Sequence, residues 1–211
     1  MMLSLSDAIP KAEALLRRAK RPDSVKPTPD ALAKMQGLLA DYGYNQEPNH
    51  EVYTAICSYG ALMLDKTNHR GLLLKGECGI GKSFGVECLA AIFRMPVYTP
   101  DNFAAAYKEL DGNKEKLGNA VTSGGDFFGE PHDIVIDELG TLDSVRNWGE
   151  AADIMCDVLD MRYRAMLRYG VKTIITTNLS DKGMLERYGR RIEDRLREMC
   201  YIKRVTGVSL R

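Results

Sequence analysis

The sequence lacks the features that would place the protein in a membrane or in an oxidising compartment. No run approaches the roughly 18 to 20 uninterrupted apolar residues of a membrane-spanning helix. Charged residues are spread through residues 1–20, where a signal peptide would be apolar. The five cysteines are odd in number and show no C-x-x-C spacing, so they predict reduced thiols. We therefore expect a cytoplasmic protein that has no membrane partner.

A net charge of one sign is also missing, because 29 basic side chains balance 29 acidic ones. The charge is nevertheless uneven. Residues 1–35 hold seven Lys and Arg against four Asp and Glu, and residues 182–211 hold nine against four. Basic ends permit contact with single-stranded or duplex DNA without requiring it. Solvated faces or internal ion pairs are the alternative interpretation.

Prolines at positions 22, 27 and 29 predict a boundary near residue 28. Residues 1–28 are expected to form a short basic amphipathic helix followed by a stiff linker, and residues 29–211 the core. Thr28 is a candidate N-cap with Pro29 at the first helical position. Two helices are thus predicted to lead into the core.

After residue 70 the apolar residues change from helical stripes to short continuous blocks. Five such blocks alternate with helical patterns: GLLLKG (71–76), PVYT (96–99), DIVID (133–137), VKTIITT (171–177) and CYIKRV (200–205). Short buried strands that alternate with helices predict the α/β class, with a central parallel sheet between helices.

The strongest motif is GECGIGKS at 76–83, a complete G-x-x-x-x-G-K-[ST] between an apolar block and a helical pattern. Its glycines let backbone N–H groups converge on a phosphate at the positive end of the following helix. Lys82 is then expected to reach the β- and γ-phosphates and Ser83 to bind Mg²⁺. The predicted cofactor-binding residues are Gly76, Glu77, Cys78, Gly79, Ile80, Gly81, Lys82 and Ser83.

A second block, DIVIDELG at 133–140, ends a hydrophobic strand with two adjacent carboxylates. Asp137 is expected to belong to the Mg²⁺ site together with Ser83. Glu138, on the opposite side of the pleat, is expected to polarise an attacking water. This pair favours ATP hydrolysis over binding alone.

Two later patterns supply further polar groups. Asn178 ends a β-branched strand and could hydrogen-bond the γ-phosphate or the attacking water. The segment RYGRRIEDRLRE at 187–198 concentrates five arginines on one short helix. A planar, permanently charged guanidinium suits the stabilisation of charge in a phosphoryl-transfer transition state, although such a helix could simply be solvated.

In this order the four blocks resemble the AAA+ ATPases, in particular the branch of DnaC/DnaI-type helicase loaders and IstB-type transposition ATPases. The resemblance covers about residues 50–211. It implies that 76–83 is Walker A, 133–140 is Walker B and Asn178 is sensor 1. It also implies an arginine finger at Arg195, with Arg191 as the other arginine of that motif, and a sensor 2 arginine at Arg211 in the closing GVSLR.

The resemblance implies an oligomer in the ATP state, with little or no C-terminal lid and a finger donated in trans. The favoured function is an ATPase that loads a replicative helicase onto DNA; the alternative is an IstB-like partner of a transposase. A monomeric small-molecule kinase and a non-hydrolysing scaffold remain as rivals. Segment 111–132, with its five glycines and the pair Phe127–Phe128, is either a DNA-contacting loop or a plain surface loop.

Overall fold

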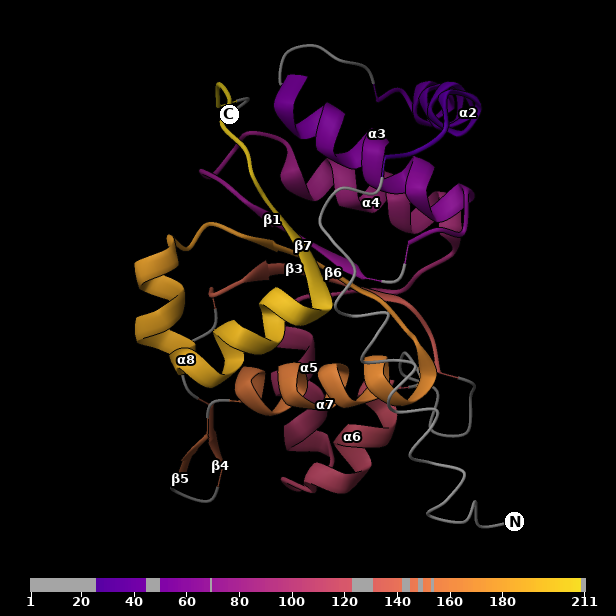
Figure 1. Cartoon of the computed structure of the whole chain (residues 1–211). Coiled ribbons are helices and arrows are strands. Elements are labelled where there is room, and N and C mark those ends of the chain that lie inside the picture. Colours follow the sequence, from indigo (N-terminus) through magenta and orange to yellow (C-terminus); the bar gives the residue numbers. More distant parts are fainter. Residues whose placement is uncertain are drawn as a thin grey trace, which may run out of the picture.

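The computed structural model describes residues 26–44, 50–68, 70–122, 131–141, 145–147, 150–152 and 154–209. A five-stranded parallel sheet lies between two layers of helices (Figure 1). The α/β fold class is therefore confirmed. The expected N-terminal helix within residues 1–21, the pair Phe127–Phe128 and Arg211 lie outside the described residues.

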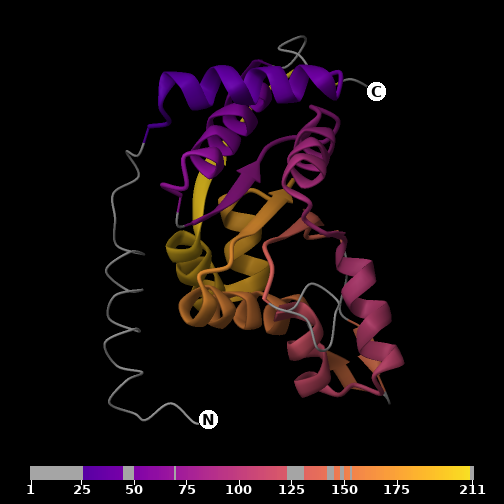
Figure 2. The same cartoon turned by 90° about the vertical axis from the view of Figure 1, so that its right-hand side faces the viewer.

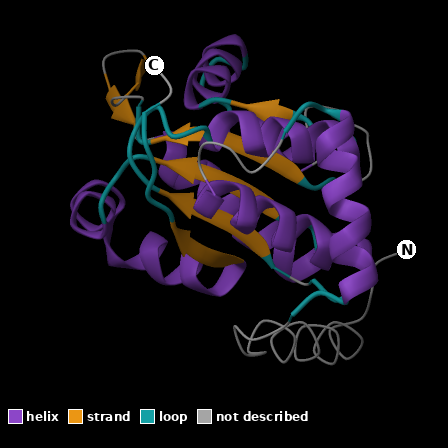
Figure 3. Cartoon of the chain, turned by 90° about the horizontal axis from the view of Figure 1, so that it is seen from above, coloured by secondary structure: helices purple, strands orange, loops and turns teal. Residues whose placement is uncertain are grey.

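All five predicted strands are present and run side by side, as the view from above shows (Figure 3). They are β1 (Gly71–Lys75), β2 (Val97–Tyr98), β3 (Ile134–Leu139), β6 (Thr173–Thr177) and β7 (Cys200–Arg204). Their order across the sheet is β2-β3-β6-β1-β7. Because β6 lies between β1 and β3, the turn after β6 is placed between the P-loop and the acidic pair.

One face of the sheet is covered by the helices that flank the P-loop strand. They are α2 (Pro29–Asp41), α3 (His50–Leu64) and α4 (Lys82–Phe93), and they share one apolar core with β1. Figure 2 shows α2 as the outermost of the three. Thr28 caps α2 as predicted, because its side chain accepts the Ala31 N–H and Pro29 is the first helical residue.

The other face is covered by a second group of helices: α5 (Pro100–Glu109), α6 (Lys114–Thr122), α7 (Ile154–Tyr169) and α8 (Asp181–Met199). Part of the expected loop at 111–132 is thus helical, and Lys114 forms an ion pair with Asp157 at 2.8 Å. A hairpin of β4 (Val145–Asn147) and β5 (Glu150–Ala152) was not predicted. Across the described residues, every helix is too short or too polar to traverse a lipid bilayer.

Arg162 of α7 organises the amino edge of the sheet, where the strands begin. It is fully buried, and its guanidinium donates to the carbonyls of Val121, His132 and Lys172 and to the Thr173 hydroxyl, over 2.8–3.0 Å. Burial lowers the pKa of Arg162 to about 10. One side chain thereby joins α6 to the segments that lead into β3 and β6.

Candidate nucleotide-binding site

The P-loop joins the carboxyl end of β1 to the first turn of α4, and its backbone requires glycine. Gly79 and Gly81 have φ values of 84° and 89°, a region that residues with a Cβ rarely adopt. A Cβ on Gly79 would also lie 2.5 Å from Oγ of Ser209. The loop therefore presents the positive end of α4 with no side chain in the way, which is the geometry of an anion site.

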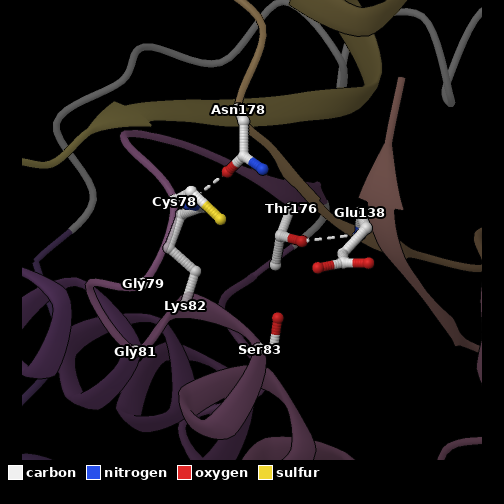
Figure 4. Close-up of a pocket in the computed structure, with 8 residues that line it drawn as sticks. All are labelled: Cys78, Gly79, Gly81, Lys82, Ser83, Glu138, Thr176 and Asn178. Atoms are coloured by element: carbon white, nitrogen blue, oxygen red, sulfur yellow. Dashed lines mark hydrogen bonds between the residues drawn. The ribbon is translucent and has the colours of Figure 1, made fainter. Parts of the chain in front are cut away.

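Lys82 is held inside this loop although its side chain carries a charge. It is 6% exposed, and Nζ donates to the carbonyls of Gly76 and Glu77 at 2.8 and 2.5 Å and to Oδ1 of Asn178 at 2.7 Å (Figure 4). Burial lowers the pKa of Lys82. All three acceptors are uncharged, so an anionic phosphate is a stronger partner for the ammonium than any of them.

The two carboxylates of β3 lie on a β-bulge. Ile136 pairs with Ile175 and Leu139 with Thr177, so Asp137 and Glu138 together face one residue of β6. Glu138 has a φ of 59°, in the left-handed region. Its carboxylate points into the pocket, above the Ser83 hydroxyl (Figure 4).

Asp137 faces the same loop, because its Oδ1 accepts the Ser83 hydroxyl at 3.1 Å. The expectation that Asp137 and Glu138 point to opposite sides of the pleat is therefore wrong. It assumed a regular strand, whereas the bulge turns both side chains toward the P-loop.

The P-loop, Glu138 and Asn178 line one pocket of about 180 Å³, so the sequence motifs of β1, β3 and β6 all meet there. Its lining residues are Cys78, Gly79, Gly81, Lys82, Ser83, Glu138, Thr176 and Asn178. The pocket offers a buried cation at a helix N-terminus, which fits the phosphates of ATP. Hard oxygen ligands from Ser83 and Asp137 fit Mg²⁺, which takes few protein ligands and completes its shell with phosphate oxygens and water.

The described residues contain no cluster of three or more His, Cys, Asp or Glu side chains that could hold a metal unaided.

Arg195 does not lie in this pocket. Helix α8 begins just past the carboxyl end of β6, breaks at Gly189 (φ 73°) and ends at Met199, and the next residue pairs with Gly71 at the start of β1. Arg195 is therefore close to the amino edge of the sheet, where it forms an ion pair with Asp160 of α7 and lies over the Tyr163 ring at 5.1 Å.

Asp160 holds two more arginines, and sequence reasoning did not single it out. Its side chain is 7% exposed and pairs with Arg191 at 2.8 Å and Arg164 at 3.2 Å, both of which are more than 70% exposed. One buried carboxylate thus pairs with three guanidiniums. Of the five arginines in 187–198, Arg191 and Arg195 are therefore not merely solvated.

The C-terminal segment passes over the P-loop. Thr206 donates both its backbone N–H and its hydroxyl to Glu51 of α3, at 2.7 and 3.0 Å, and Ser209 lies next to Gly79. These hydrogen bonds lower the pKa of Glu51. The described residues after β7 contain no helix, and the expected role of Arg211 stays a prediction.

Comparison with known proteins shows a similar fold in solved structures but no related sequence. No family model matches the sequence, and no curated protein matches it. A candidate primosome component from Streptococcus pyogenes serotype M3 is similar in structure, with 17% identity over 94% of this chain and 98% of that one and a TM-score of 0.55. DnaI is also similar in structure, with 18% identity over 92% of this chain and 94% of that one and a TM-score of 0.49. The DnaC helicase loader is similar as well, with 20% identity over 70% of this chain and 89% of that one and a TM-score of 0.48. The chain thus shares its fold with the candidate primosome component, and it has the predicted α/β architecture with a P-loop after the first strand of a parallel sheet.

Proposed function

We propose that the protein binds ATP with Mg²⁺ at the P-loop pocket and hydrolyses the ATP. The observation that carries this proposal is the convergence of Lys82, Ser83, Asp137, Glu138 and Asn178 at one edge of the sheet. When bound, Mg²⁺ would offset the charge of the phosphate oxygens. Ser83 and Asp137 would hold it.

The remaining steps belong to the side chains of the pocket. Lys82 exchanges its loop carbonyls for phosphate oxygens, at little cost because its present partners are neutral. Glu138 orients and polarises the attacking water, since its carboxylate points into the pocket. Asn178, already within 2.7 Å of the Lys82 ammonium, lies where it can contact the terminal phosphate.

The test is nucleotide binding by Lys82→Ala in calorimetry. Loss of the ammonium should remove most of the affinity, since no other cation lines the described pocket. Lys66→Ala, an exposed lysine outside the pocket, is the matched control. Equal affinity of Lys82→Ala and the wild type would reject this site.

We further propose that the ATP-bound protein assembles and that Arg195 of one subunit completes the site of the next. Its place near the amino edge of the sheet supports a role in trans, because it is remote from the pocket of its own subunit. To act there, Arg195 has to exchange Asp160 for a phosphate. Assembly and hydrolysis are thereby coupled to the opening of an ion pair.

Loading of a replicative helicase onto DNA is the process that we propose for this ATPase. It is supported by the order of the motifs and by the fold shared with the candidate primosome component, which spans nearly the whole of this chain. A pull-down with Glu138→Gln and ATP tests it: recovery of a helicase supports loading, and recovery of a transposase supports the IstB-like alternative. DNA binding, if part of the function, should be stronger with ATP and fall steeply with salt.

A further inference from the structure

Thr176 is a buried polar residue that no motif assigns to the site. It is 1% exposed and is the last but one residue of β6, with its hydroxyl facing the pocket (Figure 4). The register of β3 and β6 places it alone opposite the bulged pair Asp137 and Glu138. Thr176 is thus the cross-strand neighbour of both candidate acidic groups.

Its hydroxyl bonds to both of them. Oγ1 donates to Oδ1 of Asp137 at 2.5 Å and accepts the backbone N–H of Glu138 at 2.9 Å. A hydroxyl has one proton and two lone pairs, so it can make both bonds at once. The same Asp137 oxygen accepts the Ser83 hydroxyl, which links β6, β3 and α4 through one carboxylate atom.

The bulge requires such a partner. Two residues opposite one leave a backbone N–H without its ladder acceptor, and a buried N–H without an acceptor is costly. Glu138 also occupies the left-handed region, which is unfavourable for a residue with a Cβ. The Thr176 hydroxyl replaces the missing acceptor and holds this conformation in place.

We propose that Thr176 is a positioning residue that maintains the bulge, and that the bulge is what lets adjacent residues 137 and 138 serve one pocket. The role of Thr176 in hydrolysis rests on the proposed ATPase function, whereas its effect on the bulge does not. In a regular strand the Glu138 carboxylate would face away from the P-loop. Thr176 itself need not contact the nucleotide.

Thr176→Val removes the hydroxyl and keeps the β-branched shape, and Thr176→Ser keeps the hydroxyl. Thr173→Val is the matched control, because Thr173 is buried in the same strand and bonds to Arg162 at the opposite edge of the sheet. Thr176→Ala serves the same purpose as the valine variant should that variant not fold.

The first readout is hydrogen exchange of the Glu138 amide in the protein without nucleotide. Loss of its acceptor should speed exchange about tenfold in Thr176→Val, with recovery in Thr176→Ser and no change in Thr173→Val. An unchanged Glu138 amide in the valine or alanine variant overturns the proposal, whatever the activity.

The second readout is the split between turnover and binding. In Thr176→Val, kcat should fall about 10- to 100-fold while ATP affinity stays within about threefold, because displaced acidic groups impair the chemical step more than phosphate binding. Wild-type kcat in Thr176→Val, or a serine variant as slow as the valine variant, contradicts the proposal. If the wild type hydrolyses no ATP but the Glu138 amide responds, the proposed function fails and the positioning role stands.

Discussion

Lys82 and Arg162 are both buried cations whose described hydrogen bonds go to neutral oxygens, yet they stand at opposite edges of the sheet. Burial lowers the pKa of each. The acceptors of Lys82 are two carbonyls of its own loop and one side-chain amide. Those of Arg162 belong to α6, to the segments before β3 and β6, and to Thr173 at the start of β6, and these lie far apart in sequence.

The difference shows that a buried cation can exchange its hydrogen-bond partners at the carboxyl edge, whereas a similar cation at the amino edge keeps them. Moving Lys82 rearranges a short glycine-rich loop that borders a pocket. Moving Arg162 would leave carbonyls of several segments without a donor in the interior, which costs about 1–3 kcal/mol for each unsatisfied group. The carboxyl edge is therefore suited to binding, and the amino edge near Arg162 to holding the fold.

Replacing Glu138 should produce the largest effect of all, a loss of turnover, and this effect should be confined to the pocket at the carboxyl edge. Glu138→Gln keeps the shape of the side chain and removes its charge, so turnover should fall by about 10² to 10⁴-fold while ATP still binds. Steady-state ATPase assays and calorimetry measure the two quantities. Glu87→Gln, an exposed residue of α4, is the control, and a wild-type rate in Glu138→Gln would show that another group activates water.

Arg162→Met should give the reverse result, a loss of stability with an intact pocket. We expect about 3 kcal/mol of destabilisation, because the buried carbonyls lose their donor. For a chain of this size that lowers Tm by roughly 6–12 °C. Arg164→Met, two residues along α7 and exposed, should change stability by less than about 1 kcal/mol.

Thermal unfolding and ATP binding below the transition test this pair of variants. If folded Arg162→Met loses ATP affinity while keeping its Tm, the contrast between the two edges is wrong.

The fold could be predicted from the sequence because its signals are local. The five apolar blocks, the proline-led helix and the P-loop each depend on residues close in the chain. Arg162 was missed although a signal existed: it falls on the same face of α7 as Val158 and Ala165, which are buried. A charged residue within an apolar helical stripe could have been recognised as a buried structural group.

The shape of the acidic site could not be predicted in this way. Alternation along DIVIDELG assumes a regular strand, and the bulge depends on a hydroxyl 38 and 39 residues later in the chain. Thr176 and Thr177 end β6 after the apolar pair Ile174 and Ile175, and this polar ending is a trace of the bulge in the sequence. Likewise, five arginines in 187–198 predict a cation but not the carboxylate of Asp160, which pairs with two of them, Arg191 and Arg195.

Mixing two inactive variants should show whether Arg195, near the amino edge, can leave Asp160 and bind a phosphate in the pocket of a neighbouring subunit. Arg195→Ala keeps a good pocket without a finger, and Lys82→Ala keeps the finger without a working pocket. In a random one-to-one oligomer about a quarter of the interfaces combine the intact pocket with the intact finger, so up to about a quarter of the wild-type ATPase rate should return.

Arg191→Ala mixed with Lys82→Ala is the matched control, since Arg191 shares the Asp160 carboxylate but is largely exposed. If Arg191→Ala behaves as the inactive finger variant and Arg195→Ala is active alone, the finger is Arg191. A mixture that stays inactive although sedimentation shows co-assembly would make both arginines structural.

The smallest effect is expected for Asp181, which ties the start of α8 to the carboxyl edge. Its carboxylate accepts Lys75 at 2.7 Å and Arg204 at 2.5 Å, and the hydrogen bonds from these two cations lower its pKa to about 2. Because the folded-state pKa lies below the usual value near 4, the stability that the carboxylate contributes is complete above about pH 4. It is lost as the pH falls toward 2. Asp181 is about half exposed, so the contribution should stay below about 1 kcal/mol.

Urea unfolding of the wild type and Asp181→Asn, followed from neutral pH downward, measures this contribution. The difference in unfolding free energy between them should be constant above about pH 4 and shrink below it. Asp194→Asn, an exposed residue of α8 beyond its break at Gly189, separates this effect from a general change of charge. A difference that grows on acidification would mean that the carboxylate costs stability, and that Lys75, next to the P-loop, is held by burial rather than by Asp181.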